Sequence, residues 1–455
     1  MTQQITSNDV TIFRNQFASD AAATVAQNAV TNNAVNAVAL NRSIIQTTDT
    51  KNFSHKVDKS WSVTNQKSSG RCWLFATLNL FRIGAMKKLN VKEFEFSQAY
   101  VHFWDKFERC NHFLEAMIET ASRDVDDRTV AYMLHDPIGD GGQWCMAINI
   151  IRKHGLVPKS VFPESRSSSE TRLMNTNLKE ILRCSACEIR NILSSTSGDQ
   201  GLRLAIDHKR KRLGDVWRML CIHLGTPPET FSWQWTDVNG SFHRVRDVSP
   251  VEFCLEYACV NRDINEYVCL VNDPRNPFMQ TYTVDYLQSV VGGDPVVYLN
   301  VDAETMKRIT QQQLEAGEAV WMGCDVGKQL HRESGVWDKE MFQYQELYGV
   351  SYGMNKAQRL LHGQTLMTHA MMFTGVDVVE GRPLRWRVEN SWGENSGEKG
   401  FYTMNDNWFE EHMFEIAAPR SYLSEEMLQC LDTLKPIRLP AWDPMGSLAR
   451  SEAYL

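Results

Sequence analysis

The chain has 455 residues, which at about 150 residues per domain predicts roughly three structural units. Hydrophobic residues make up 43% of the sequence and charged residues 23%, so a sizeable core can form and wholesale disorder is excluded. The formal net charge of -7 argues against nucleic acid as the main partner, because phosphate binding draws on excess basic charge.

The compartment is indicated by the N-terminus and the cysteines. The opening stretch MTQQITSND has neither a basic region nor an apolar core of the kind that a signal peptide needs. No window approaches the length of apolar sequence that crosses a bilayer. Eleven scattered cysteines are an odd count and typical of reduced thiols. We therefore expect an intracellular protein without a membrane partner.

Residues 1–60 form the first predicted unit, an N-terminal helical segment. The stretch from Asp20 to Leu40 is rich in Ala and Val and lacks Pro and Gly, which favours one or two polar surface helices. A flexible arm is the alternative interpretation.

Residues 61–155 form the second unit, whose main feature is a helix from Cys72 to Lys88. Its apolar residues cover most of a helical wheel, so the helix is expected to be buried nearly all round. The turn-forming residues 68–70 stand directly before Cys72, which places this cysteine at the start of the helix.

The remaining chain changes character from helix to strand. Residues 156–304 read as a mainly helical region with Pro-containing loops, and residues 305–430 as a strand-rich one with Gly-rich turns. Residues 431–455 form a C-terminal arm that contains the stiff segment Pro-Ala-Trp-Asp-Pro at 440–444. Helices early and strands late predict an α+β fold with two unlike halves.

Cys72 is the first candidate for chemistry. A nucleophilic cysteine must ionise near neutral pH, and the N–H groups and dipole of a helix N-terminus favour the thiolate. A cysteine on an apolar helix is by itself more often a small core residue. Gln66, six residues earlier across the turn, could donate its side-chain N–H to an oxyanion together with the Cys72 backbone N–H.

A histidine partner is expected from the strand-rich region. His369 begins one predicted strand, and Asn390 follows the next one. Neighbouring strands can bring the two side chains together, so that the amide oxygen of Asn390 holds one ring nitrogen and directs the other toward Cys72. Trp392 could cover that hydrogen bond and keep water away.

These pieces together resemble the papain-like cysteine peptidases. Ser69-Gly70-Arg71-Cys72-Trp73 matches the family's nucleophile signature imperfectly, and Asn390-Ser391-Trp392-Gly393 is the more specific match. The resemblance implies a catalytic set of Cys72, His369 and Asn390, with Gln66 in the oxyanion hole. It also implies a core of two halves, one helical with the cysteine helix and one barrel-like with the His and Asn.

The sequence departs from the family pattern in three places. Ser69 stands where secreted members have a disulfide-forming cysteine, which is consistent with a reducing compartment. Cys72 and His369 are 297 residues apart, about twice the family's usual separation, so a large insertion is expected at 156–304, serving as an oligomerisation hook. Only 71 residues precede Cys72, too few for a long inhibitory propeptide.

With these departures, the sequence resembles the bleomycin hydrolase branch of the family. The segments that carry this likeness are residues 65–73, 93–98, 140–144, 323–328 and 439–446. The branch implies a cytoplasmic cysteine aminopeptidase that hydrolyses peptides and amides with a free N-terminal amine, assembles as a homohexamer and needs no metal or organic cofactor.

The resemblance also implies the substrate-binding residues: Gly141 and Gly142 for the peptide backbone, Trp392 over the site, and Ala449 at the end of the C-terminal arm in the cleft. An ordinary turn is the alternative interpretation of the two glycines. The chain continues six residues past Ala449, and we expect it to be trimmed near Ala449 or Arg450.

Other interpretations remain open at this stage. One is a nucleic-acid-binding or scaffolding hexamer with secondary peptidase activity, and another is an open-cleft endopeptidase. The basic run 209–212 is read as a solvated helix face, and the Cys-x-x-Cys pair at 184 and 187 lacks the further ligands of a zinc site.

Overall fold

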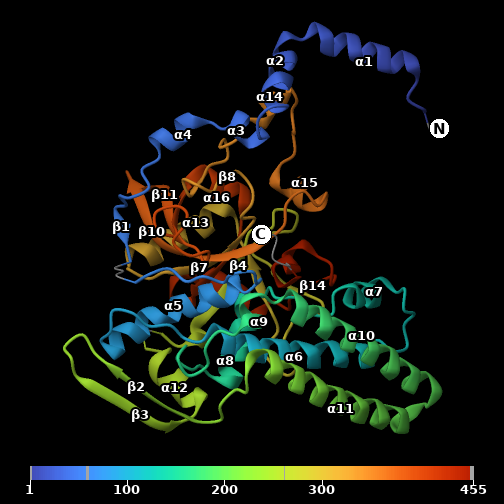
Figure 1. Ribbon diagram of the computed structural model, residues 1–455, viewed down its shortest axis with the longest axis vertical. Helices are drawn as coiled ribbons and strands as arrows, with labels where there is room; N and C mark the ends of the chain where they lie inside the picture. The colour runs from blue at the N-terminus through green and yellow to red at the C-terminus, as the bar shows by residue number, and fades with distance from the viewer. Residues whose placement is uncertain (1–2, 58–60, 261, 451–455) are drawn as a thin grey trace.

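The computed structural model describes residues 3–57, 61–260 and 262–450; the proposed trimming of the tail at 451–455 falls outside this range, and nothing is described of the Arg450 side chain. A large sheet packs between and beside helices, and the predicted α+β class is confirmed (Figure 1). Within the described part of the chain, no helix combines the length and apolar character that crossing a membrane requires.

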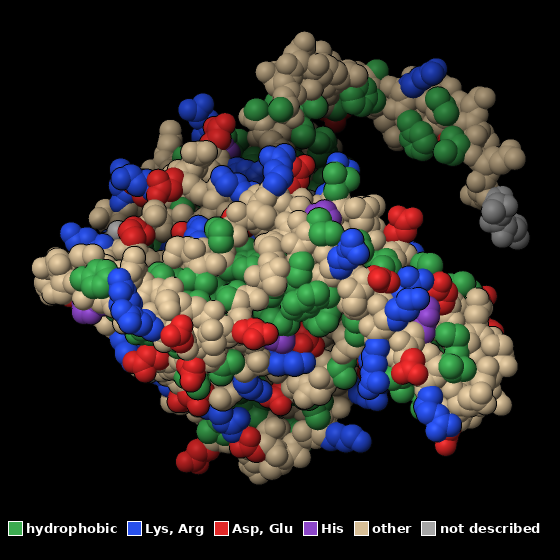
Figure 2. Space-filling view, turned by 60° about the horizontal axis from the view of Figure 1, so that its bottom comes forward, with side chains coloured by type: hydrophobic (Ala, Val, Ile, Leu, Met, Phe, Trp, Pro, Cys, Tyr) green, Lys and Arg blue, Asp and Glu red, His purple; other side chains and the backbone are tan. Residues whose placement is uncertain are grey.

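The N-terminal segment consists mainly of helices, of which α1 and α2 project from the body (Figure 1). Its elements are α1 (Ser7–Ser19), α2 (Ala21–Val30), α3 (Val35–Ala39), α4 (Arg42–Thr47) and the short strand β1 (His55–Lys56). Two of them, α2 and α3, lie in the stretch for which one or two helices were predicted. Figure 2 shows hydrophobic side chains gathered on the outer part of this segment, where Phe13 is 60% and Phe17 45% exposed.

The helices that follow surround the predicted nucleophile. They are α5 (Cys72–Leu89), α6 (Gln98–Glu119), α7 (Arg128–His135) and α8 (Trp144–His154). In α5 the residues from Cys72 to Met86 are all buried, and Lys87 and Lys88 are exposed near its end, which confirms the predicted central helix. One side of α5 packs against the sheet and another against α6 and α8, which accounts for its all-round apolar surface.

The region 156–304 is helical at first and then becomes part of the sheet. Its first elements are α9 (Arg166–Ser169), α10 (Arg172–Ser195), α11 (Gly198–Leu224), the hairpin β2 (Phe231–Thr236) and β3 (Phe242–Val248), and α12 (Pro250–Tyr257). After the one-turn helix η1 (Ile264–Glu266) come β4 (Tyr267–Val271), β5 (Thr281–Val284) and β6 (Tyr298–Asn300), which join the main sheet. The region predicted to be mainly helical thus holds helices α9 to α12 and a hairpin, and its last part adds three short strands to the sheet.

Two sequence motifs of this region, the Cys-x-x-Cys pair and the basic run 209–212, lie on helices α10 and α11. Cys184 and Cys187 are exposed on α10. In the basic run on α11, Lys209 is ion-paired with Glu115 and Arg212 is paired with Glu188. These two cations are thus engaged with acids of neighbouring helices.

The main sheet carries the predicted histidine near its centre. The later elements are α13 (Ala303–Glu315), β7 (Val320–Cys324), β8 (Leu330–His331), β9 (Val336–Trp337), α14 (Tyr344–Tyr348), α15 (Lys356–Leu361), β10 (His369–Val379), β11 (Arg382–Glu389), β12 (Phe401–Asn405), α16 (Asp406–His412), β13 (Met413–Pro419), η2 (Arg420–Tyr422), α17 (Glu425–Thr433), β14 (Ile437–Leu439) and η3 (Pro444–Arg450). The strand order is β14-β5-β6-β4-β13-β7-β10-β11-β12-β9-β8, with β1 also paired to β10. Strand β10 runs antiparallel to both β7 and β11 and packs on α5, so it joins the two halves.

Candidate active site

The sulfur of Cys72 lies where the first turn of α5 meets strand β10. Cys72 is the first residue of α5 and is 2% exposed. The backbone N–H of Ala370 donates a hydrogen bond of 3.4 Å to its Sγ. Because Ala370 directly follows His369, the sheet brings the start of β10 to the thiol, as the order of motifs predicts.

His369 is held by Asn390 in the predicted way. His369 is the first residue of β10, and Asn390 directly follows β11. A hydrogen bond of 2.9 Å joins His369 Nε2 to Asn390 Oδ1. The same Oδ1 accepts from the backbone N–H of Ser391 at 2.7 Å, so it is an acceptor and Nε2 must carry the hydrogen. In the neutral ring, Nδ1 is then the acceptor that can receive a proton.

Trp392 covers this pair. Its ring lies 5.0 Å from that of His369 with a tilt of 35°. The guanidinium of Arg332 lies over the Trp392 ring, 4.4 Å from its centre. Together the two side chains place an aromatic layer and a cation beside the imidazole.

Burial keeps the two reactive groups neutral in this arrangement. It raises the pKa of the Cys72 thiol to about 11, although the Ala370 N–H works in the opposite direction. It lowers the pKa of His369 to about 4 despite the bond to Asn390, and the charge of Arg332 adds to the lowering. The sequence predicted a depressed thiol pKa from the helix N-terminus; here the loss of water around the sulfur outweighs that effect.

Gln66 spans the two halves next to the nucleophile. Its Nε2 donates to the carbonyl of Ser69 at 2.5 Å, and its Oε1 accepts from the hydroxyl of Ser391 at 2.6 Å. The Gln66 backbone N–H also donates to the Ser391 carbonyl at 2.8 Å. One amide N–H therefore fixes the turn before Cys72, and the second is left as the possible oxyanion donor.

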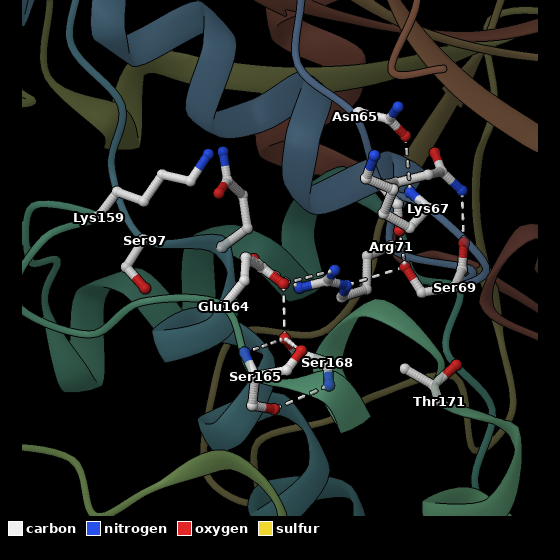
Figure 3. A network of polar contacts seen from close by, with 12 residues as sticks. Asn65, Lys67, Ser69, Arg71, Ser97, Lys159, Glu164, Ser165, Ser168 and Thr171 are labelled. Carbon is white, nitrogen blue, oxygen red and sulfur yellow. Dashed lines mark hydrogen bonds and ion pairs between the residues drawn. The ribbon is translucent and has the colours of Figure 1, made fainter. Parts of the chain in front are cut away.

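An ion pair that the sequence analysis missed supports the turn before Cys72 (Figure 3). Arg71, the N-cap residue of α5, donates through Nη1 to Glu164 at 3.0 Å and pairs through Nη2 with the other carboxylate oxygen at 2.9 Å. Its Nε donates to the Ser69 hydroxyl at 2.9 Å, and Ser168 donates to Glu164 at 2.6 Å. A buried arginine beside the nucleophile requires an acidic partner, but its position in the sequence gives no way to choose Glu164.

Asp140 also supports the chain around Cys72, and the sequence analysis did not predict this role. Its carboxylate accepts the Gly70 N–H at 3.1 Å and pairs with Lys106 at 2.7 Å. Its backbone carbonyl accepts the indole N–H of Trp73 at 2.7 Å. Charged partners hold the pKa of Asp140 well below its usual range in spite of burial. The residues on both sides of Cys72 are thus tied to one carboxylate residue.

The two predicted substrate-binding glycines lie against this support. A Cβ at Gly142 would come within 2.5 Å of the Trp73 ring, so the glycine is required there by packing. The carbonyl of Gly141 accepts a hydrogen bond from Arg109. Their role toward a substrate stays a prediction.

The C-terminal arm contacts both halves. The Ser447 hydroxyl donates to the carbonyl of Met367, two residues before His369, at 2.8 Å. From the helical half, Gln143 Nε2 donates to the Met445 carbonyl at 3.3 Å. Ala449 is 4% exposed. The arm therefore lies between the segment before the histidine and the segment after the two glycines.

Among the residues that the structure describes, no group of three or more His, Cys, Asp or Glu side chains is arranged to hold a metal ion.

Comparisons with known proteins point to the same chemistry. The model of the Peptidase C1-like family matches residues 4–446. The chain is 43% identical to "Bleomycin hydrolase" of Gallus gallus, with 94% of each chain covered. It is 41% identical to "Aminopeptidase C" of Listeria monocytogenes, with 87% of this chain and 88% of the relative covered. The crystal structure of pepw from Lactobacillus rhamnosis HN001 superimposes with a TM-score of 0.94 at 40% identity and covers 98% of this chain and 99% of that one.

Proposed function

The chain belongs to the Peptidase C1-like family, and from this premise we propose that it is a cysteine aminopeptidase, which removes N-terminal residues from peptides and related amides. The observation that carries the proposal is the joining of Cys72 and the His369–Asn390 pair at one point, where the N–H after His369 reaches the sulfur. Relatives named bleomycin hydrolase and aminopeptidase C support both the chemistry and the exopeptidase specificity.

The reaction is an acyl transfer in two steps. His369 Nδ1 takes the proton of the Cys72 thiol as the sulfur attacks the carbonyl carbon that follows the N-terminal residue. The negative charge on the carbonyl oxygen is received by the Cys72 backbone N–H and the second N–H of Gln66. The C–N bond breaks as His369 returns the proton to the leaving amine, and a thioester remains on Cys72.

Water then releases the acyl group. His369 Nδ1 removes a proton from the water, whose oxygen attacks the thioester carbon. The C–S bond breaks, the acid leaves, and the proton passes back to the sulfur. Asn390 holds the imidazole in one orientation through both steps, so that the same nitrogen serves as base and then as acid.

The arm provides the preference for the first residue of a substrate. Met445, Leu448 and Ala449 are buried against the protein and take up space between the halves. A substrate whose chain continues on that side would have to displace them. We therefore expect productive binding when the substrate ends there with its own amine.

A pair of matched substrates tests the proposal. An aminoacyl amide with a free α-amine should be hydrolysed, and the same compound with an acetylated amine should be hydrolysed much more slowly. Cys72→Ala should abolish both reactions while the far-UV circular dichroism stays the same. Equal turnover of the two compounds would instead indicate an open-cleft endopeptidase, and activity that survives Cys72→Ala would reject the mechanism.

We also propose that the protein acts in the cytoplasm as a homohexamer, as the resemblance implies. The exposed side chains Val10, Phe13 and Phe17 on the projecting helix α1 support contact with another copy of the chain, because exposed apolar side chains that gather on one element mark interaction sites. Multi-angle light scattering should give six times the chain mass. The double substitution Phe13→Ser, Phe17→Ser should lower that mass, and an unchanged hexamer would exclude α1 from the interface.

A further inference from the structure

One guanidinium group connects the C-terminal arm to the nucleophile helix. Arg109 lies on α6 and is 8% exposed. Its Nη1 donates to the carbonyl of Ala449 at 3.2 Å, and its Nη2 donates to the carbonyl of Gly141. Its central carbon lies 5.6 Å from a ring centre of Trp73, the residue after Cys72.

The guanidinium of Arg109 is itself held in place by a carboxylate of the same helix. Nε of Arg109 donates to Asp105 Oδ1 at 2.7 Å, and this carboxylate is fully buried one turn earlier on α6. A planar guanidinium with three separate partners has little freedom to rotate. Two of these partners, Asp105 and Gly141, belong to the helical half, so the direction of the Nη1 donor is set largely without the arm.

The contact with Ala449 differs from the two arm contacts nearest to it. Ser447 and Met445 bond to the neutral partners Met367 and Gln143. Arg109 contributes a charged donor at the last residue of the arm whose side chain is described. The same group holds Gly141, where the substrate backbone is expected, so the end of the arm and the substrate segment share one anchor.

We propose that Arg109 is a specificity-determining residue, which fixes the end of the C-terminal arm beside Gly141 and so restricts substrates to those that end at this point with a free amine. The inference rests on the proposed aminopeptidase function for its consequence, but the anchoring of the arm can be measured without any activity. Arg109 touches neither the sulfur nor the imidazole in the described contacts, and it acts through the arm.

The test uses the full-length chain with two substitutions in α6. Arg109→Met alone would leave Asp105 as an unpaired buried carboxylate, so the variant of choice is the double substitution Asp105→Asn, Arg109→Met. Asp105→Asn alone is the matched control, because it perturbs the same buried site and leaves the Nη1 donor for Ala449. Leu448→Asp, which places a charge at a fully buried arm position, provides a variant with a displaced arm.

Hydrogen–deuterium exchange of a peptide covering residues 444–449 reports on the arm. The double variant should exchange at least about tenfold faster there than wild type, and the control should stay close to wild type. Unchanged exchange in the folded double variant would overturn the anchoring, whatever the enzyme does.

The ratio of kcat/KM for the free-amine amide to that for its N-acetyl counterpart reports on specificity. The double variant should lower this ratio about tenfold or more, and the control should not. Combined with Leu448→Asp, the Arg109 substitution should lower it no further, because both act through the same arm. A released arm with an unchanged ratio, or full additivity of the two changes, would overturn the role in specificity. A wild type that already accepts both substrates equally would refute the proposed function, while the exchange experiment would still decide the anchoring.

Discussion

The backbone nitrogen of Ala370 lies 3.4 Å from the sulfur of Cys72, across a separation of 298 residues in sequence. The contact exists because β10 packs directly on α5, so that the first residues of the strand reach the first turn of the helix.

Replacing Gln66 by Ala should lower kcat by about 10²–10³-fold with a smaller change in KM, because an oxyanion donor acts mainly in the transition state. Steady-state kinetics on an aminoacyl amide measure both constants. Ser391→Ala is the control, since it removes the hydroxyl that bonds to the Gln66 oxygen and keeps the donor. Similar kcat values in the two variants would mean that Gln66 only braces the turn.

Replacing His369 by Gln should make the free energy of unfolding fall less steeply as the pH drops. The pKa of His369 is lowered from 6.5 to about 4, so below pH 6.5 the unfolded chain binds a proton that the folded protein does not. The free energy of unfolding therefore falls as the pH drops from 6.5 to about 4, by at most about 3 kcal/mol from this group. His102 and His412, whose pKa values are also lowered, remain in both proteins. Urea unfolding from pH 7 to 4 gives the difference, and parallel curves would contradict it.

Replacing Asn390 by Ala should lower kcat about 10²-fold, because the imidazole loses the partner that fixes its orientation. Asn390→Asp should also raise the pKa of His369, since a carboxylate in that place favours the imidazolium. Nuclear magnetic resonance titration of the His369 ring in the two variants measures this second effect. An Asp variant with an unaltered or lower His369 pKa would show that the two side chains do not interact in solution.

Replacing Gly142 by Ala should destabilise the protein by about 1–3 kcal/mol and reduce activity, because the added carbon would meet the Trp73 ring at 2.5 Å. Gly214→Ala is the matched control. Gly214 lies in α11 with no atom within 4 Å of an added carbon, and alanine there should be neutral or stabilising. Thermal unfolding compares the two, and equal melting temperatures would mean that Trp73 moves aside without strain.

Replacing Glu164 by Gln should destabilise the protein by about 2 kcal/mol and slow catalysis, because the buried guanidinium of Arg71 loses its counter-charge next to Cys72. Glu170→Gln is a suitable control, since Glu170 pairs with the exposed Arg166 on the short helix α9. Chemical unfolding and the rate of Cys72 alkylation together check the result. A stable variant with normal alkylation would show that the ion pair does not position the nucleophile turn.

Local features of the sequence were sufficient to predict the elements that carry the site. Apolar residues cover most of the helical wheel of residues 72–86 and predict a helix buried nearly all round, and the turn before it places Cys72 at the N-terminus. Strands beginning at His369 and ending at Glu389 follow from short apolar runs bounded by turn residues. Each of these depends on neighbours within a few residues, and such information is present in the chain itself.

The sequence did not reveal that residues 267–300 would contribute strands to the main sheet. The segments β4, β5 and β6 belong to the main sheet, because β4 pairs with β13 and β6 with β4. Strand β13, the partner of β4, comes more than a hundred residues later in the chain. A short apolar run does not reveal whether a distant strand will complete its hydrogen bonds.

What the sequence determined by itself is the identity of the reacting groups: a cysteine at a helix start, a histidine at a strand start and an amide beside it. What the tertiary structure decided is which side chains surround these groups. Glu164 beside Arg71, Asp140 beneath Gly70 and Arg109 beside Ala449 come from separate parts of the chain. The reversal of the expected pKa of Cys72 has the same origin, because the amount of water around a sulfur depends on packing that no local pattern encodes.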